Sequence, residues 1–328
     1  MSLRITATVE RWPVAGQFIM SRGAKTYVDV VVVAISDGKY VGFGEGTAIY
    51  YRQESAESCL AQVESVIGDL EPLSADSARA LLQVLLPPGA ARNALDCALW
   101  DVAAKAAGLP LWQYAGLAAA PKPLVTAFTI SLGEAKAMQA DATTAASKGY
   151  GLLKLKLTGD GDRARVAAVR AGAPRSRLIV DANESWEGLD IVTEAAAMAE
   201  LGVEMIEQPI PAGQDAMLAG MKSPLPLLAD ESCHSAADVA ALAPYYDGVN
   251  IKLDKAGGLT EAIKIADAAQ AAGLKIMVGC MLSTTLGVAP AFVLAQRANW
   301  VDLDGPALLA EDRKNGFRFA GGMIIPPA

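Results

Sequence analysis

The chain has 328 residues, of which 52% are hydrophobic and 20% are charged, and its formal net charge is −8. This composition is typical of a folded protein with a large core, which excludes a disordered chain. A net negative charge repels phosphate groups and anionic lipids, so we expect neither nucleic acid nor a membrane as a partner.

Cysteine and histidine are scarce, which excludes several kinds of site. The four cysteines stand apart in the sequence, at Cys59, Cys97, Cys233 and Cys280. Without a Cys-x-x-Cys pair, neither a zinc ribbon nor a dithiol redox site is expected. Scattered cysteines in a chain of this size are typical of a reduced, cytoplasmic protein. His234 is the only histidine, so sites built from several histidines are also excluded.

The N-terminal third of the chain predicts an α+β unit. Leu3–Arg11 alternates weakly and Tyr27–Ile35 is rich in β-branched residues, so both are expected to be strands. Residues 36–39 read as a turn, after which Tyr40–Gly46 is expected to return as the second arm of a hairpin. Three helical stretches follow, at residues 54–69, 75–85 and 90–107. Strands followed by helices are typical of the α+β class.

The remainder of the chain alternates short apolar runs with alanine-rich helical stretches, which predicts a parallel sheet. Eight runs are strand candidates: Thr126–Ser131, Leu152–Leu157, Leu178–Asp181, Glu204–Glu207, Leu225–Asp230, Val249–Leu253, Lys275–Gly279 and Trp300–Asp304. Eight evenly spaced strands favour a closed barrel. The alternative is an open, doubly wound sheet, whose dinucleotide-binding form needs a Gly-x-Gly-x-x-Gly turn that we do not find.

Carboxylates at the ends of these strands are candidates for chemistry, since burying an unpaired charge costs several kcal/mol. Asp181, Glu207 and Asp230 end three consecutive strands. Active sites of barrels lie at this end of the strands. Three converging carboxylates without histidine or thiol ligands suit Mg²⁺ better than Zn²⁺. The alternative is that each carboxylate caps the helix that follows it.

Lysines on two strands are the candidate bases. Lys154 and Lys156 share one face of their strand, and the opposite face carries Leu153, Leu155 and Leu157. Strands of a parallel sheet are buried on both sides, so the lysines should point into the barrel; a solvated edge strand is the alternative. Two ammonium groups this close are expected to lower each other's pKa, and a lysine must be neutral to act as a base. Lys252 is expected across the barrel, with an ion pair to a neighbouring Asp as its alternative.

The last strand carries a further acidic pair. Asp302 and Asp304 share one face of this strand and are expected near the mouth of the barrel. For Asp304 the alternative is a turn, because Gly305 and Pro306 follow it directly.

The order Lys-x-Lys, three acidic strand ends and Asn-x-Lys resembles the enolase superfamily over nearly the whole chain. Lys252 stands where the mandelate-racemase subgroup has a His–Asp dyad, so the resemblance is to the muconate-lactonizing subgroup. It implies an α/β fold, a (β/α)7β-type modified TIM barrel with an N-terminal α+β capping domain. The implied parts are residues 1–118 as the capping domain, 119–305 as the barrel and 306–328 as a C-terminal segment that returns to the capping domain.

The resemblance also implies roles for the site residues. Mg²⁺ would be held by Asp181, Glu207 and Asp230, with Lys156 and Lys252 as the two bases and Lys154 as a further cation. The Asp302-x-Asp304 pair resembles that of the dipeptide epimerases, which holds the substrate's α-ammonium group. Four further residues match substrate-binding positions: Arg22, like a loop arginine that pairs with the glutamate side chain in Ala-Glu epimerases, and Thr129, Cys280 and Leu282 along the dipeptide backbone.

The expected function is that of an isomerase, an Mg²⁺-dependent dipeptide epimerase that inverts the Cα of the C-terminal residue. L-Ala-D-Glu and L-Ala-L-Glu are the expected pair, interconverted by two-base 1,1-proton transfer through an enediolate. The alternatives within the superfamily are an N-acylamino acid racemase, an o-succinylbenzoate synthase and a muconate cycloisomerase. Outside the enzymes, the alternative is a barrel that binds a metal-chelated ligand without turnover. The resemblance suggests recycling of cell-wall peptides and leaves room for a homo-oligomer.

Overall fold

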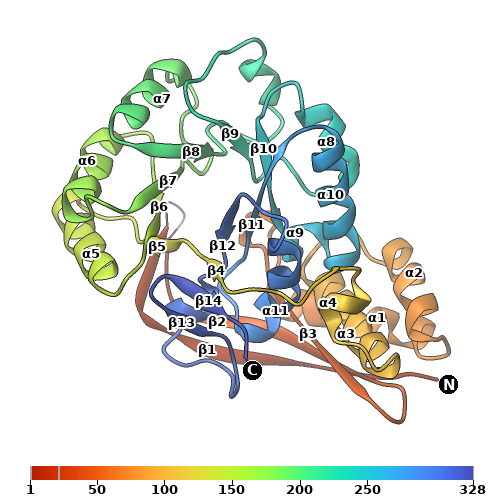
Figure 1. The fold of residues 1–328 in the computed structure, drawn as a ribbon. Coiled ribbons are helices and arrows are strands. Elements are labelled where there is room, and N and C mark those ends of the chain that lie inside the picture. The colour runs from red at the N-terminus through yellow and green to blue at the C-terminus, as the bar shows by residue number, and fades with distance from the viewer. Residues whose placement is uncertain (1, 21–22, 328) are drawn as a thin grey trace.

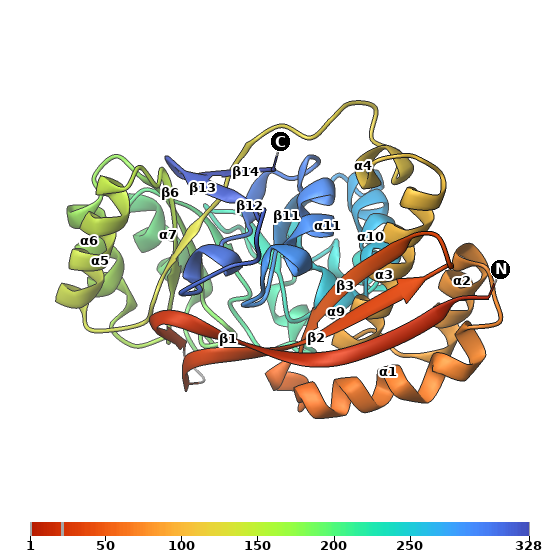
Figure 2. The same ribbon diagram turned by 90° about the horizontal axis from the view of Figure 1, so that it is seen from below.

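The structure, a computed structural model, describes residues 2–20 and 23–327. An N-terminal antiparallel sheet with its helices lies against one end of a parallel barrel, and a small C-terminal sheet lies at the other end (Figures 1 and 2). Among the described residues, no helix is long and apolar enough to cross a membrane.

The N-terminal sheet is a three-stranded meander of β1 (Arg4–Met20), β2 (Gly23–Ser36) and β3 (Val41–Thr47). The predicted turn after β2 is confirmed, because the side chain of Asp37 accepts hydrogen bonds from the backbone N–H groups of Lys39 (2.8 Å) and Tyr40 (2.7 Å). This Asx turn reverses the chain between the two hairpin arms.

The first strand is far longer than predicted. It was expected to end at Arg11, yet β1 continues to Met20 and stays paired with β2. The pairing register shifts between Pro13 and Phe18, so the alternation of apolar and polar residues is broken at this point. A bulge of this kind removes the period-2 signal that the sequence prediction relied on, and it carries the hairpin over the barrel.

Helices cover the N-terminal sheet, close to where they were predicted: α1 (Ala56–Leu70), α2 (Ala75–Leu85) and α3 (Ala90–Ala106), with the short η1 (Tyr50–Arg52) and α4 (Leu111–Tyr114). Strand β3 packs directly on α3. A Cβ at Gly44 would lie 2.1 Å from the carbonyl oxygen of Ala94, and a Cβ at Gly46 would lie 2.1 Å from that of Ala90. Only glycine permits this approach, which fixes the position of the residues that follow β3.

The barrel consists of eight parallel strands: β5 (Phe128–Ile130), β6 (Leu152–Lys156), β7 (Arg177–Asp181), β8 (Val203–Glu207), β9 (Leu227–Ala229), β10 (Gly248–Lys252), β11 (Lys275–Gly279) and β12 (Trp300–Asp302). They pair in chain order, and the N–H of Ala127 closes the ring on the carbonyl oxygen of Val301 at 2.8 Å. All eight predicted strands are present, so the predicted barrel class is confirmed and the open doubly wound sheet is excluded.

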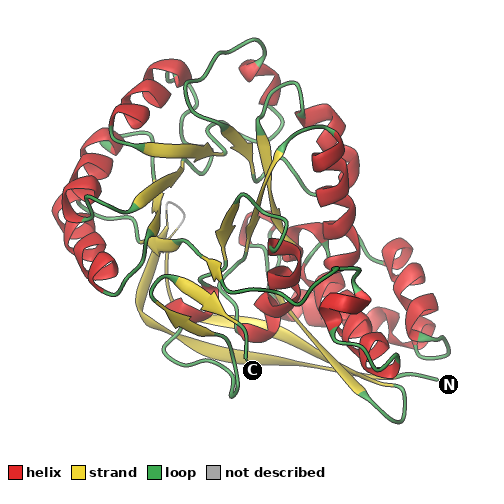
Figure 3. Ribbon diagram, viewed as in Figure 1, coloured by secondary structure: helices red, strands yellow, loops and turns green. Residues whose placement is uncertain are grey.

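Helices surround the barrel (Figures 1 and 3): α5 (Ala135–Ser147), α6 (Asp162–Gly172), α7 (Ile191–Glu200), α8 (Ala236–Leu242), α9 (Leu253–Ala256), α10 (Leu259–Ala271) and α11 (Thr285–Ala295). The connection from β8 to β9 is the exception, since its only helical element is the 3-10 turn η2 (Asp215–Leu218). On the outside of the barrel, the connection between β8 and β9 is therefore mostly a loop, where the other connections have an α-helix.

The C-terminal segment contacts structure at both ends of the barrel. After η3 (Gly305–Leu308), the N–H of Ala310 donates to the carbonyl oxygen of Pro13 in β1 at 2.8 Å. The chain then forms β13 (Arg318–Ala320) and β14 (Met323–Ile325), and β14 pairs with β4 (Leu124–Val125). This three-stranded sheet lies away from the N-terminal sheet in Figure 2.

Two buried carboxylates join the N-terminal sheet to the barrel. Oδ1 of Asp254, in α9, accepts hydrogen bonds from the Thr47 N–H (2.9 Å) and the Asn93 side chain (2.8 Å). Glu45, in β3, accepts a hydrogen bond from the N–H of Thr284 at 2.7 Å and pairs with Arg313 at 2.9 Å. Neutral donors compensate the charge of Asp254 only in part, and burial raises its pKa to about 7.

Replacing Asp254 by Asn should therefore stabilise the protein at neutral and alkaline pH. The folded state keeps a proton on Asp254 that the unfolded chain loses from about pH 4 upward, so wild-type stability falls between about pH 4 and pH 7. Asn accepts the same two hydrogen bonds without ionising. We expect Tm of Asp254→Asn at pH 8 to exceed that of the wild type by at least about 2–4 °C, the shift that about 1 kcal/mol makes.

Calorimetric melting at pH 4 and pH 8 measures this effect, with Asp267→Asn, at an exposed position of α10, as the control. The difference between Asp254→Asn and wild type should close at pH 4. A variant that is less stable than the wild type at pH 8 would show that the interface needs the ionised carboxylate.

Candidate active site

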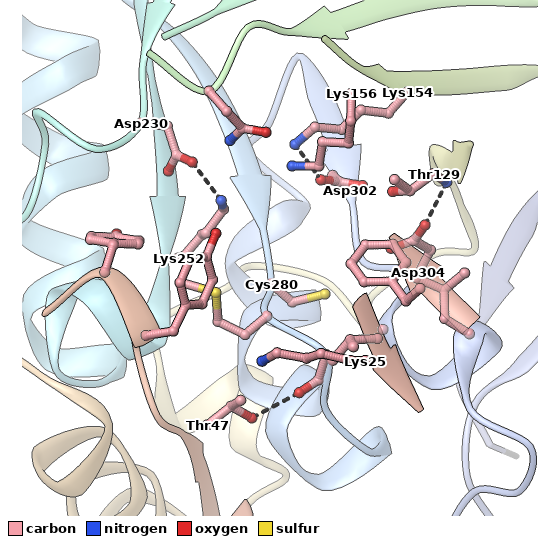
Figure 4. A pocket seen from close by; sticks show the side chains of 18 of the residues that line it. Lys25, Thr47, Thr129, Lys154, Lys156, Asp230, Lys252, Cys280, Asp302 and Asp304 are labelled. Atoms are coloured by element: carbon pink, nitrogen blue, oxygen red, sulfur yellow. Dashed lines mark hydrogen bonds and ion pairs between the residues drawn. The ribbon is translucent and has the colours of Figure 1, made fainter. Parts of the chain in front are cut away.

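The carboxyl ends of the parallel strands bring the predicted lysines and carboxylates together. In β6 the residues Leu153 and Leu155 pack outward against the helices, while Lys154 and Lys156 line a pocket inside the barrel. The predicted orientation of the two lysines is thus confirmed, and a solvated edge strand is excluded because all five residues of β6 are buried. Figure 4 shows Lys252 facing them across the pocket, as its place in β10 predicts.

Three carboxylates form the floor of the site. Asp181 ends β7, Glu207 ends β8 and Asp230 follows β9, and all three are buried. One oxygen from each lies within 4.8 Å of the others, the arrangement of a group that could hold a metal ion. The donors are hard oxygens with no thiol or imidazole among them, so the set fits Mg²⁺.

The lysines are paired with these carboxylates. Nζ of Lys154 lies 2.6 Å from Oε2 of Glu207, 3.2 Å from Oδ2 of Asp181 and 2.8 Å from Oδ2 of Asp302. Nζ of Lys156 lies 2.6 Å from Oδ2 of Asp181.

On the opposite side of the pocket, Nζ of Lys252 lies 2.5 Å from Oδ2 of Asp230 and 3.8 Å from Oε1 of Glu207. The ion pair to a neighbouring Asp, which was the alternative interpretation of Lys252, is therefore present within the site itself. The two candidate bases contact different carboxylates, so they approach the centre of the pocket from different directions.

Burial and mutual repulsion act on the carboxylates together. Burial raises the pKa of Glu207 to about 7, and the negative charge of Asp181 adds to the effect. Burial also favours the neutral form of Asp181, but Lys156 and Lys154 lower its pKa to about 2. A divalent cation among these groups would relieve the repulsion, which is the electrostatic reason for expecting a metal here.

The expected mutual lowering of the lysine pKa values does not hold for Lys154. Burial alone would lower the pKa of Lys154, but Asp302, Glu207 and Asp181 raise it well above its ordinary value. The prediction from sequence considered the neighbouring ammonium group and did not include three carboxylates from other strands. The three carboxylates consequently favour the charged form of Lys154.

The remaining predicted substrate-binding residues line the same pocket: Thr129, Cys280, Leu282, Asp302 and Asp304. Asp304 lies after β12, at the start of η3, so the turn that was its alternative interpretation is present and Asp304 is not part of the strand. The N–H of Thr129 donates to Oδ2 of Asp304 at 2.7 Å, which ties this turn to β5 at the barrel mouth. Burial raises the pKa of Asp304 to about 7, with a further contribution from Asp302. Arg22, the predicted partner of a substrate side chain, lies outside the described residues.

Two protein-family patterns match the chain. Residues 3–116 match the mandelate racemase / muconate lactonizing enzyme N-terminal domain, and residues 137–328 match the enolase C-terminal domain-like family. The chain belongs to the enolase superfamily. The family predicted from the Lys-x-Lys, three-carboxylate and Asn-x-Lys pattern is therefore confirmed.

Two similar relatives carry names that refer to glutamate-containing substrates. The L-Ala-D/L-Glu epimerase of Escherichia coli K12 is 42% identical over 96% of this chain and 97% of its own. The N-acetyl-D-glutamate racemase of a Pseudoalteromonas species is 41% identical over 90% of this chain and 93% of its own.

Solved structures show the same architecture. An enolase family member from Agrobacterium tumefaciens with homology to dipeptide epimerases, bound to sodium and L-Ala-L-Glu, is 46% identical with a TM-score of 0.94 over 99% of this chain and 98% of its own. A dipeptide epimerase from Methylococcus capsulatus, complexed with Mg and L-Arg-D-Lys, is 31% identical with a TM-score of 0.90 over 99% of this chain and 97% of its own.

Sequence reasoning missed the contribution of the N-terminal domain to this superfamily site. Phe18 and Lys25 reach the pocket from the hairpin, and Tyr50 and Tyr51 reach it from η1. Phe18 and Lys25 were missed because the bulge in β1 breaks the alternating pattern of the hairpin. No periodic pattern marks Tyr50 and Tyr51. Glu231 also lines the pocket, and a signal for it was available, since a second charged residue directly follows the strand-end Asp230.

Proposed function

We propose that this protein is an Mg²⁺-dependent dipeptide epimerase that inverts the Cα of the C-terminal residue of L-Ala-D-Glu and L-Ala-L-Glu. The observation that carries the proposal is one arrangement: three buried carboxylates at a single point, with lysines on opposite strands of the barrel. The family and the named activities of the relatives support it.

Inversion at Cα needs proton transfer on both faces of the carbon. Lys156, from β6, would exchange the proton on one face and Lys252, from β10, on the other, which is the requirement for 1,1-proton transfer through an enediolate. Mg²⁺ held by Asp181, Glu207 and Asp230 would supply electrostatic stabilisation of the negative charge that develops on the substrate carboxylate. Lys154, held by three carboxylates, would add a further positive charge.

The far end of the pocket suits the ammonium group of a dipeptide. Asp302 and Asp304 together present two carboxyl groups there, and Oδ1 of Asp302 is buried without a hydrogen-bond partner among the described residues. An ammonium group would satisfy this oxygen. In the proposal, Thr129, Cys280 and Leu282 lie along the dipeptide backbone between the two charged ends.

A cation from the hairpin suits an acidic side chain on the epimerised residue. Lys25 lines the pocket, and among residues 2–20 and 23–327 no carboxylate lies within 4.0 Å of its ammonium group. Its Nζ lies 5.3 Å from the ring centre of Tyr50, and burial lowers its pKa. A half-buried cation without a counter-ion is unfavourable, and a substrate carboxylate would compensate it. We include Arg22 in this subsite on the resemblance alone.

An N-acylglutamate racemase is the second candidate. Its support is the Pseudoalteromonas relative together with the state of the acidic pair. Asp302 is already paired with Lys154, and the raised pKa of Asp304 favours its neutral form. The negative charge of Asp302 and Asp304 is therefore partly compensated already. This part of the pocket needs a substrate ammonium group less than two free carboxylates would.

We also propose the cytoplasm as the location and cell-wall peptides as the source of the substrate. All four cysteines are free, which suits a reducing compartment. The dipeptide named for the Escherichia coli relative joins alanine to glutamate of either hand. Such an activity would need a supply of peptides that contain D-glutamate.

Removing either proposed base should abolish inversion and leave proton exchange on one face. We expect Lys252→Ala and Lys156→Ala to lose epimerisation by at least about 10²–10⁴-fold, since each removes a general acid or base. In D₂O, each variant should still exchange the Cα proton of one epimer, and the two variants should exchange opposite epimers. Proton NMR of L-Ala-D-Glu and L-Ala-L-Glu measures this, with Lys264→Ala, at an exposed position of α10, as the control. Exchange of the same epimer by both variants would place the lysines on one face.

Lys25 should set the preference for an acidic side chain. Replacing it by Met should lower kcat/KM for L-Ala-L-Glu by about 10- to 100-fold, the effect of losing one charge-assisted hydrogen bond. The same variant should leave kcat/KM for L-Ala-L-Gln unchanged. Steady-state polarimetry on both dipeptides provides the measurement, with Lys39→Met as an exposed control. Equal losses on the two dipeptides would indicate damage to the hairpin.

The two candidate substrates are distinguished by the wild-type enzyme. If the acidic pair binds an ammonium group, kcat/KM for L-Ala-L-Glu should exceed that for N-acetyl-L-glutamate by at least about 10-fold. Asp302→Asn should narrow this difference, because it should lower kcat/KM for L-Ala-L-Glu more than kcat/KM for N-acetyl-L-glutamate. Faster turnover of N-acetyl-L-glutamate would favour the second candidate.

A further inference from the structure

Lys255 is a fourth lysine at the site, and the proposed mechanism does not use it. It lies three residues after Lys252 and is 1% exposed. Its Nζ lies 2.5 Å from Oδ1 of Asp230, and it donates hydrogen bonds to the backbone carbonyl oxygens of Asp230, Cys233 (3.1 Å) and Asn250 (3.1 Å). These three carbonyls and Oδ1 of Asp230 surround the ammonium group and share its three N–H donors, so Lys255 is held in place by the backbone while it contacts the carboxylate.

The two oxygens of Asp230 have different surroundings. Oδ2 contacts Lys252, whose Nζ also lies 3.8 Å from Oε1 of Glu207, so Oδ2 faces the other carboxylates. Oδ1 faces Lys255, which lies behind Asp230 and does not line the pocket. Lys252 does line the pocket and can leave its carboxylate, whereas Lys255 is enclosed.

We propose that Lys255 is a positioning residue that restricts Asp230 to one ligand oxygen and thereby favours Mg²⁺ over Ca²⁺ at this site. The inference rests on the proposed function, in which Asp230 is a metal ligand. Mg²⁺ needs compact octahedral geometry and accepts single oxygens from carboxylates, while Ca²⁺ takes six to eight oxygens and often binds carboxylates through both. Fixing Oδ1 on Lys255 removes one oxygen that Ca²⁺ would use.

The test compares two variants that change the charge equally and the geometry differently. Lys255→Met and Lys252→Met each remove one positive charge next to Asp230. Because Mg²⁺ and Ca²⁺ carry the same charge, this electrostatic change cancels in the ratio of their dissociation constants. Only Lys255→Met frees Oδ1 of Asp230, since Lys252 contacts the oxygen that already faces the site.

Titration calorimetry of the wild type and both variants with MgCl₂ and CaCl₂ measures the ratio directly. We expect Lys255→Met to shift the Ca²⁺ to Mg²⁺ preference toward Ca²⁺ by about 10-fold, within the range for residues that support a ligand. Lys252→Met should leave the ratio within about twofold of the wild type. If Lys255→Met changes the dissociation constants of Mg²⁺ and Ca²⁺ by the same factor, the inference is overturned and Lys255 is a purely structural residue.

Two further measurements separate this inference from the proposed function. If the wild type binds no Mg²⁺, or if Asp230→Asn binds it unchanged, the proposed metal site is wrong. If Lys255→Met does not fold, a crystal structure of the Mg²⁺-loaded wild type decides. Contact of Oδ1 of Asp230 with Lys255 alone would support the inference, and coordination of the metal through both oxygens of Asp230 would overturn it.

Discussion

The constraint on which this structure depends is the balance of buried charge at the mouth of the barrel. Four carboxylates, Asp181, Glu207, Asp230 and Asp302, meet four lysines there, and each of these eight residues is buried. Removing one ion from water costs several kcal/mol, and pairing repays that cost only where the geometry is excellent, so a buried cluster of this size is weak evidence for stability. The apolar burial of the barrel core offsets this desolvation free energy. The charged cluster is retained because it is the proposed catalytic machinery.

The wall of the pocket is made by the interface between the N-terminal sheet and the barrel. Thr47 lines the pocket while its N–H binds Asp254 and its hydroxyl donates to the carbonyl oxygen of Leu282 at 2.9 Å. Glu45, two residues earlier, binds the N–H of Thr284 at the start of α11. The contacts that hold the two parts together therefore also set the shape of the pocket, so changes in the interface act on the site without touching the lysines.

The sequence predicted the barrel and its charged centre because both have a repeating local signal. Each parallel strand is a short apolar run, and a charge at its end, such as Asp181 or Glu207, lies at the same edge as the others. Contacts without a local signal were not predictable. The bulge after Pro13 hid the long hairpin and Lys25, and the partners of Lys255 come from three separate segments of the chain. The roles of the individual site residues stay predictions.

Four lysines of identical chemistry differ here only in what surrounds them. Lys154 also lines the pocket, but it contacts carboxylates from three strands, which suits a cation that keeps its charge. Lys156 contacts one carboxylate, and Lys252 contacts one closely and a second at 3.8 Å; both line the pocket. A base must alternate between charged and neutral forms, so it needs few fixed counter-ions and direct access to substrate. The contacts around each lysine thus separate the proposed bases from the fixed cations, even for Lys154 and Lys156, which share strand β6.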